Sequence, residues 1–226
     1  MSSINKYNPF FRITGIVLFS IVISQPLWAH AVVGELEKMS RTDAAVLYMV
    51  LGYKHILPLG FDHILFVLSL FLLSPKLKPV LFQATAFTIA HSVTLGLAMY
   101  NVIKVPSAII EPLIALSIMY VALENIFSPR LKTSRIGVVF IFGLVHGLGF
   151  AGALGQLGLP QNAYLVSLIM FNIGVELGQL TVILLAYFLL ARWFGNKPYY
   201  RKVIVIPLSA LIAAIAAFWT IQRIFF

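Results

Sequence analysis

The sequence predicts an all-α fold, a polytopic membrane helix bundle with six transmembrane helices after an N-terminal signal peptide. Hydrophobic residues make up 61% of the 226 residues and charged residues only 10%, whereas soluble domains have about 25% charged residues. The mean hydropathy is +0.98, and a soluble fold of this size cannot bury so much apolar surface. The continuous apolar runs are about twice as long as the roughly ten-residue strands of a transmembrane barrel. Soluble enzymes and soluble binding domains are therefore excluded.

Residues 1–31 have the features of a signal peptide. Lys6 and Arg12 form a basic start, and Ile13–Ile23 is an apolar core. Residues 29–31, with the sequence AHA, fit the small-x-small pattern of a cleavage site. Cleavage after this tripeptide starts the mature chain at Val32. An uncleaved first helix is the alternative.

The next segment, residues 32–57, is predicted to be periplasmic or interfacial, because its start carries too many charges for a membrane span. Residues 58–226 then form the six-helix transmembrane domain. A spanning helix needs about 17–25 apolar residues, and the first of the six candidates is short. The candidates are Pro58–Leu73, Pro79–Met99, Ser107–Phe127, Ile136–Leu154, Ala163–Ala191 and Val203–Ile221.

Basic residues in the loops predict the orientation of the bundle. Nine of them follow the first, third and fifth spans: Lys76, Lys78, Arg130, Lys132, Arg135, Arg192, Lys197, Arg201 and Lys202. The opposite loops carry only Lys104, and the C-terminal end carries Arg223. Because short cytoplasmic loops are enriched in Lys and Arg, we expect a bacterial inner-membrane protein. Its mature N-terminus and its C-terminus are expected in the periplasm.

Net charge and cysteine content narrow the chemistry. The formal net charge of +9 is explained by the orienting loops and does not indicate binding of nucleic acid. The sequence contains no Cys, which excludes disulfides, thiolate metal sites and Cys nucleophiles. Any metal site must therefore use imidazole, carboxylate, amide or backbone ligands.

Ionisable residues inside the spans are the candidate functional residues, because each is costly in a membrane. They are His55, Asp62, His63, His91, Glu111, His146, Glu176 and Glu124. Basic residues are nearly absent from the same spans, which favours a cation site over structural ion pairs. The histidines are expected in the outer half, Glu176 near the midplane and Glu124 near the inner end. These ligands suit nickel, cobalt, zinc or copper better than magnesium or calcium. For any single residue, an interhelical hydrogen bond is the alternative role.

The sequence around these residues resembles the HupE/UreJ family of membrane proteins. The matching stretches are HILPLGFDH (55–63), AFTIAHS (86–92), EPLIALS (111–117), YVALEN (120–125), FGLVHGLGFA (142–151) and FNIGVELGQ (171–179). The resemblance implies nickel permease activity and metal-binding roles for His55, Asp62 and His63. Ile56 replaces a Pro of the family pattern, and ILFV follows His63 where the nickel permeases commonly show Ala-Met. The chain therefore looks like a branch that diverged from the nickel permeases.

Together these features predict a membrane permease or metal-binding protein for a divalent transition metal, with nickel favoured. An outer His/carboxylate site would feed the inner carboxylates. The expected partners are the metal ion and the lipid bilayer, with a homo-oligomer or metalloenzyme-maturation proteins as further candidates. A transporter is favoured over an enzyme. Two alternatives stay open: an intramembrane metalloenzyme, whose metal activates water or oxygen, and a non-catalytic assembly subunit of a membrane complex.

Overall fold

The computed structural model describes residues 39–226. The predicted signal peptide, its cleavage site and the mature N-terminus lie outside the described residues. Within 39–226 all regular structure is helical, which confirms the predicted all-α class.

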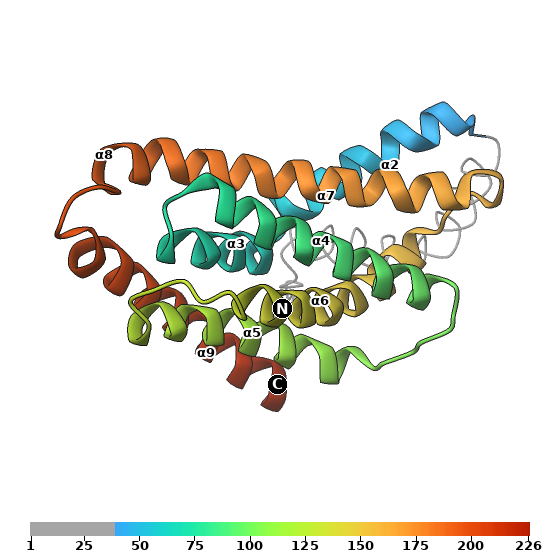
Figure 1. Ribbon diagram of the computed structural model, residues 1–226. Coiled ribbons are helices and arrows are strands. Elements are labelled where there is room, and N and C mark those ends of the chain that lie inside the picture. The colour runs from blue at the N-terminus through green and yellow to red at the C-terminus, as the bar shows by residue number, and fades with distance from the viewer. Residues whose placement is uncertain (1–38) are drawn as a thin grey trace, which may run out of the picture.

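Most helices run along the long axis of the molecule (Figure 1). Their bounds are α2 (Arg41–Ile56), α3 (Phe61–Leu73), α4 (Leu77–Met99), α5 (Ser107–Phe127), α6 (Arg135–Leu157), α7 (Tyr164–Ala186), α8 (Arg192–Phe194) and α9 (Ile206–Phe225). Three short helical segments adjoin them: η1 (Gln161–Ala163), η2 (Tyr187–Ala191) and η3 (Arg201–Val205).

Five helical stretches are long and apolar enough to cross a membrane. They are Leu77–Met99, Ser107–Phe127, Arg135–Leu157, Gln161–Phe194 and Arg201–Phe225, and they closely follow five of the predicted spans. Helices α2 and α3 pass the same test only as a pair, which is bent by 67° at the break between them. The bundle therefore has five candidate spans, or six if the bent pair is one span.

The break between α2 and α3 follows from two residues of the connecting segment. Pro58 has no N–H group and disfavours helical backbone at the residue before it; Leu57 accordingly has φ −123° and ψ 121°. A Cβ atom at Gly60 would overlap the carbonyl oxygen of His55, so only glycine permits this close approach. The chain thus turns tightly and brings the start of α3 next to the end of α2.

Helix α2 lies against α7 instead of standing apart at a surface (Figure 1). The two backbones approach closely because a Cβ at Gly52 would overlap the carbonyl oxygen of Phe171, and one at Gly174 that of Met49. Small residues commonly allow such packing of membrane helices. The charges that predicted an interfacial segment lie near its start. The close contacts with α7 involve later residues, Met49 and Gly52.

Three helix pairs dominate the packing: α2 with α7, α4 with α6, and α5 with α9. Helix α3 touches α4, α5, α7 and α9, so it joins the pairs. The connections after α3, α5 and α7 lie at one end of the bundle and those after α4 and α6 at the other (Figure 1). The nine basic residues that predict the orientation belong to the first of these ends.

Candidate metal centre

Four histidines from four helices meet at the break between α2 and α3. His55 comes from the end of α2 and His63 from the first turn of α3, while α4 supplies His91 and α6 supplies His146. The ring centroid of His63 lies 4.5 Å from that of His55, 5.0 Å from that of His146 and 6.0 Å from that of His91. His55, His63 and His91 can each offer one ring nitrogen, and these nitrogens lie within 4.8 Å of one another. We call the four residues the histidine centre.

Each imidazole of the centre has one buried ring nitrogen without a hydrogen-bond partner among the described residues. These atoms are Nε2 of His55, His63 and His91, and Nδ1 of His146. His91 and His146 are 0% exposed and His63 is 5% exposed. Leaving a buried polar group unpaired costs about 1–3 kcal/mol, so four such atoms in one place require an explanation. A transition-metal ion would satisfy those of His55, His63 and His91, which lie close enough to share it, and imidazole nitrogen is one of its preferred ligands.

Phenylalanine rings surround the imidazoles. The ring centroid of His55 lies 3.9 Å from that of Phe150. The ring centroid of His146 lies 5.0 Å from that of Phe87 and 5.2 Å from that of Phe66. The ring nitrogens are therefore the polar groups that this part of the core offers to an ion.

The centre lies midway along the bundle. His146 is eleven residues after Arg135, the first residue of α6, and eleven before Leu157, the last. At about 1.5 Å per residue it is about 17 Å from either end of the helix. The histidines were expected in the outer half of the bundle. His55 and His63 lie deeper in the bundle than expected, because they flank the α2–α3 break and α2 extends from this break toward one end of the bundle.

A cavity of about 410 Å³ reaches the histidine centre from one end of the bundle. Its polar lining consists of Lys54, His55, Asp62, His63, Glu111 and Arg223. Leu154 and Leu157 of the last turn of α6 also line it, which places it toward the end with the connections after α4 and α6. We call this cavity the vestibule.

Asp62 lines the vestibule, but an arginine pairs with its carboxylate. Nη2 of Arg223 donates to both carboxylate oxygens of Asp62 at 3.0 Å, and Nη1 donates to the carbonyl oxygen of Glu111 at 3.2 Å. The side chain of Glu111 is exposed. The expectation that no basic side chain could pair with a carboxylate of the spans is therefore wrong for Asp62. Arg223 comes from the far end of the sequence and was interpreted only as a topology signal.

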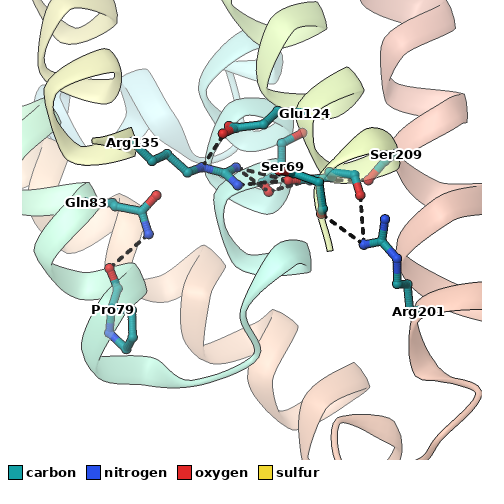
Figure 2. Close-up of polar contacts among 9 residues, drawn as sticks. Ser69, Pro79, Gln83, Glu124, Arg135, Arg201 and Ser209 are labelled. Carbon is teal, nitrogen blue, oxygen red and sulfur yellow. Dashed lines mark hydrogen bonds and ion pairs between the residues drawn. The ribbon is translucent and has the colours of Figure 1, made fainter. Parts of the chain in front are cut away.

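Glu124 is also paired, at the end of the bundle that carries the basic loops (Figure 2). Its Oε2 lies 3.4 Å from Nε of Arg135, which is 1% exposed. The same guanidinium donates to Oδ1 of Asn125 at 3.0 and 3.1 Å and to the carbonyl oxygen of Ser69 at 3.4 Å. The expectation of unpaired inner carboxylates is therefore wrong here too, because Arg135 belongs to the interior and not to a loop.

Glu176 lies in a separate groove between α4 and α7, away from the vestibule. Thr85 Oγ1 donates to its Oε1 at 2.7 Å, while its Oε2 has no hydrogen-bond partner among the described residues. Thr88, Ser92 and Asn172 line the same groove, which has a volume of about 470 Å³. The structure thus brings the four histidines together, places Glu111 in the vestibule that His55 and His63 line, and places Glu124 and Glu176 elsewhere.

Two side chains that contact the centre were not among the predicted site residues. Asn172 contacts His91, and Ser117 contacts His146. The spacing of Asn172 and Glu176 along one helix face is visible in the sequence, so the first contact had a signal. No sequence pattern indicates the contact of Ser117 with His146, because this contact depends on how α5 and α6 face each other.

The chain was compared with known proteins. A family model described as HupE / UreJ protein matches residues 32–223. Comparison with curated proteins and with solved structures gives no match. The family match spans most of the chain and includes all four histidines of the centre, and the chain therefore belongs to the HupE/UreJ family.

Proposed function

We propose that this protein carries a divalent transition-metal ion across the membrane, with nickel as the favoured cargo and cobalt, zinc or copper as alternatives. The observation that supports this most strongly is the set of four buried imidazole nitrogens that have no hydrogen-bond partner in the described part of the chain. Their depth in the bundle and their all-nitrogen character suit an ion from the later part of the first transition series. Family membership and the apolar spans support a role in the membrane.

Access to the centre differs between the two ends of the bundle, as alternating access requires. The vestibule leads to His55 and His63 from the end expected to face the periplasm. At the other end, the Arg135 guanidinium binds residues of α3 and α5 (Figure 2). These contacts support an outward-open state whose inner end is closed. Inward release then requires the Arg135 contacts to open.

The charge balance of the centre suits release of the ion. Among the described residues, Arg223 pairs with the carboxylate of Asp62, the residue directly before His63. A dication held only by neutral ligands in apolar surroundings keeps its charge uncompensated, which limits its affinity. The membrane potential can drive the ion inward, since a doubly charged ion gains about 4.6 kcal/mol per 100 mV.

Metal binding and uptake by reconstituted protein test this function. We expect His91→Ala to weaken nickel binding more than about 100-fold, since even residues that only support a ligand cost about 10–100-fold. The neighbouring Ser92→Ala is the matched control, because Ser92 donates only to the carbonyl oxygen of Thr88. Proteoliposomes with wild-type protein and with Ser92→Ala should accumulate nickel, and those with His91→Ala should not. Uptake by His91→Ala at the wild-type rate would contradict the proposal.

A metal-holding role, as an intramembrane metalloenzyme or an assembly subunit, is the second candidate. The carboxylates of the inner half of the bundle favour this role. Arg135 pairs with Glu124, and Glu176 lies in the groove between α4 and α7. No line of free carboxylates therefore leads inward from the centre among the described residues. Elemental analysis distinguishes the two candidates: a metal that stays bound through purification, together with absent uptake, would support the holding role.

A further inference from the structure

His91 is oriented by an amide whose own orientation is fixed. Nδ1 of His91 lies 3.2 Å from Oδ1 of Asn172. The amide nitrogen of Asn172 donates to the carbonyl oxygen of Leu168 at 2.8 Å, so the amide oxygen must face the imidazole. A carbonyl oxygen only accepts hydrogen bonds. Nδ1 of His91 therefore carries the proton, and in the neutral ring Nε2 has the free lone pair.

His146 is oriented in the opposite sense by a hydroxyl group. Nε2 of His146 lies 2.9 Å from Oγ of Ser117, and this oxygen donates to the carbonyl oxygen of Ile114 at 2.7 Å. A serine hydroxyl has one proton, and the shorter contact uses it. Oγ of Ser117 therefore accepts from Nε2–H of His146. The free lone pair of this ring is on Nδ1, the nitrogen that has no hydrogen-bond partner.

The other two imidazoles of the centre lack such support. Within residues 39–226, no side chain forms a hydrogen bond with His55 or His63, and both line the vestibule. The centre thus has two halves. His91 and His146 are held by side chains of the packed core, whereas His55 and His63 lie on the two sides of the α2–α3 break.

We propose that Asn172 and Ser117 are positioning residues that set opposite tautomers, so that His91 binds metal through Nε2 and His146 through Nδ1. This inference rests on the proposed metal-binding function and names the residues that pre-organise it. The held pair presents its lone pairs before metal arrives, while His55 and His63 adapt to an ion that enters by the vestibule. Hydrogen-bonded partners of this kind fix the tautomer of metal-ligating histidines in other proteins.

The tautomers can be read directly by ¹⁵N NMR of metal-free, histidine-labelled protein, because protonated and free ring nitrogens differ strongly in chemical shift. In the wild type we expect protonated Nδ1 in His91 and protonated Nε2 in His146. In Asn172→Leu the proton of His91 should no longer be confined to Nδ1, and in Ser117→Ala the proton of His146 should no longer be confined to Nε2. Each variant should bind nickel about 10–100-fold more weakly. Asn172→Asp and Ser117→Thr keep the accepting oxygen and should retain the wild-type tautomers.

Two matched controls separate positioning from packing. Ser167→Ala removes another fully buried serine, and Gln179→Leu removes another buried amide from α7; neither should change a tautomer. Unchanged tautomers in Asn172→Leu and Ser117→Ala would overturn the inference, even if wild-type protein transports nickel. Wild-type protein that shows both tautomers but binds no metal would refute the proposed function and leave the tautomer assignment intact.

Discussion

At the scale of single residues, the centre is distinguished by ring nitrogens that lack a hydrogen-bond partner within residues 39–226. Asp62 and Glu124 lie 3.0 and 3.4 Å from arginine nitrogens, so their charges are compensated within the fold. Four imidazole nitrogens are not satisfied in this way. The imidazoles, more than the carboxylates, are therefore the candidate ligands for an ion.

Metal affinity should decrease as the pH falls. An imidazole that has taken up a proton has no free lone pair, so protons and metal compete for the same nitrogens. We expect the Kd for nickel to change little from about pH 8 to about pH 5 and to rise only at lower pH, because burial disfavours the charged imidazolium. Calorimetry in buffers of different ionisation enthalpy measures the Kd and the number of protons released on binding. A Kd that does not rise even near about pH 3 would argue against imidazole ligands.

The sequence predicted the histidines of the centre but not the partners of the carboxylates. The four histidines stand out because each lies in or beside a stretch that is otherwise largely apolar. Arg135 and Arg223 instead stand near the ends of spans, where the loop-charge rule assigns such residues to water. A long arginine side chain can nevertheless reach inward from such a position, and Asp62 and Arg223 are 161 positions apart. No local pattern reveals a contact of that kind.

At the scale of helices, close approach between backbones sets the geometry of the centre. A Cβ at Gly147 of α6 would overlap the carbonyl oxygen of His91 and Oγ1 of Thr94, both on α4. Gly152 of the same helix has open space at this position. The two glycines of one helix therefore offer a matched pair of substitutions.

Gly147→Ala and Gly152→Ala should change stability in opposite directions. The first should lower the free energy of unfolding by about 1–3 kcal/mol, as overpacking of a core usually does. The second should raise it by up to about 1 kcal/mol, because alanine favours helix more than glycine does. Thermal unfolding in detergent micelles measures both. Equal effects of the two substitutions would show that α4 and α6 do not pack so closely.

Removing the charge of Glu124 should destabilise the inner end of the bundle while sparing metal binding. Glu124→Gln leaves the buried guanidinium of Arg135 without its carboxylate, and we expect a loss of about 1–3 kcal/mol in unfolding free energy. Glu176→Gln is the control, since Glu176 accepts only from a threonine hydroxyl and should change stability by less than about 1 kcal/mol. Denaturant titration compares the two variants, and a large loss of nickel affinity in Glu124→Gln would place Glu124 in the metal path after all.

The spans themselves could be predicted well, because the length of an apolar run determines where a membrane helix begins and ends. The predicted Ser107–Phe127 has the same bounds as α5. Pro58 and Gly60 are residue types that interrupt a helix, and the α2–α3 break lies at them. The sequence did not show that α2 packs on α7, because the small residues that allow this packing, Gly52 and Gly174, are separated along the chain. Tertiary contacts decided that point.

At the scale of the whole molecule, the centre connects elements that otherwise belong to different helix pairs. His55 belongs to the α2–α7 pair, and His91 and His146 belong to the α4–α6 pair. His63 belongs to α3, which packs on α5 and several other helices. The histidine centre is therefore a junction of the bundle.

The orientation of the bundle can be tested by introducing single cysteines, and no native cysteine has to be removed first because the chain contains none. We expect Lys104→Cys to react with a membrane-impermeant thiol reagent from the outside of intact cells. Lys132→Cys should react only after the membrane is opened, since its loop belongs to the basic end. Labelling of Lys132→Cys in intact cells would reverse the predicted topology.

The interruption between α2 and α3 also predicts a link between metal binding and the rigidity of the protein. An ion bound by His55, His63 and His91 would cross-link α2, α3 and α4 at the break. Binding at 100 times Kd stabilises a folded protein by about 2.7 kcal/mol, and here that gain would be concentrated where the helix is interrupted. The amides on both sides of the break should accordingly exchange their hydrogens more slowly in the loaded protein. The metal-free protein would then be more mobile at the break than the metal-bound protein, so that hydrogen exchange alone can report whether the centre is occupied.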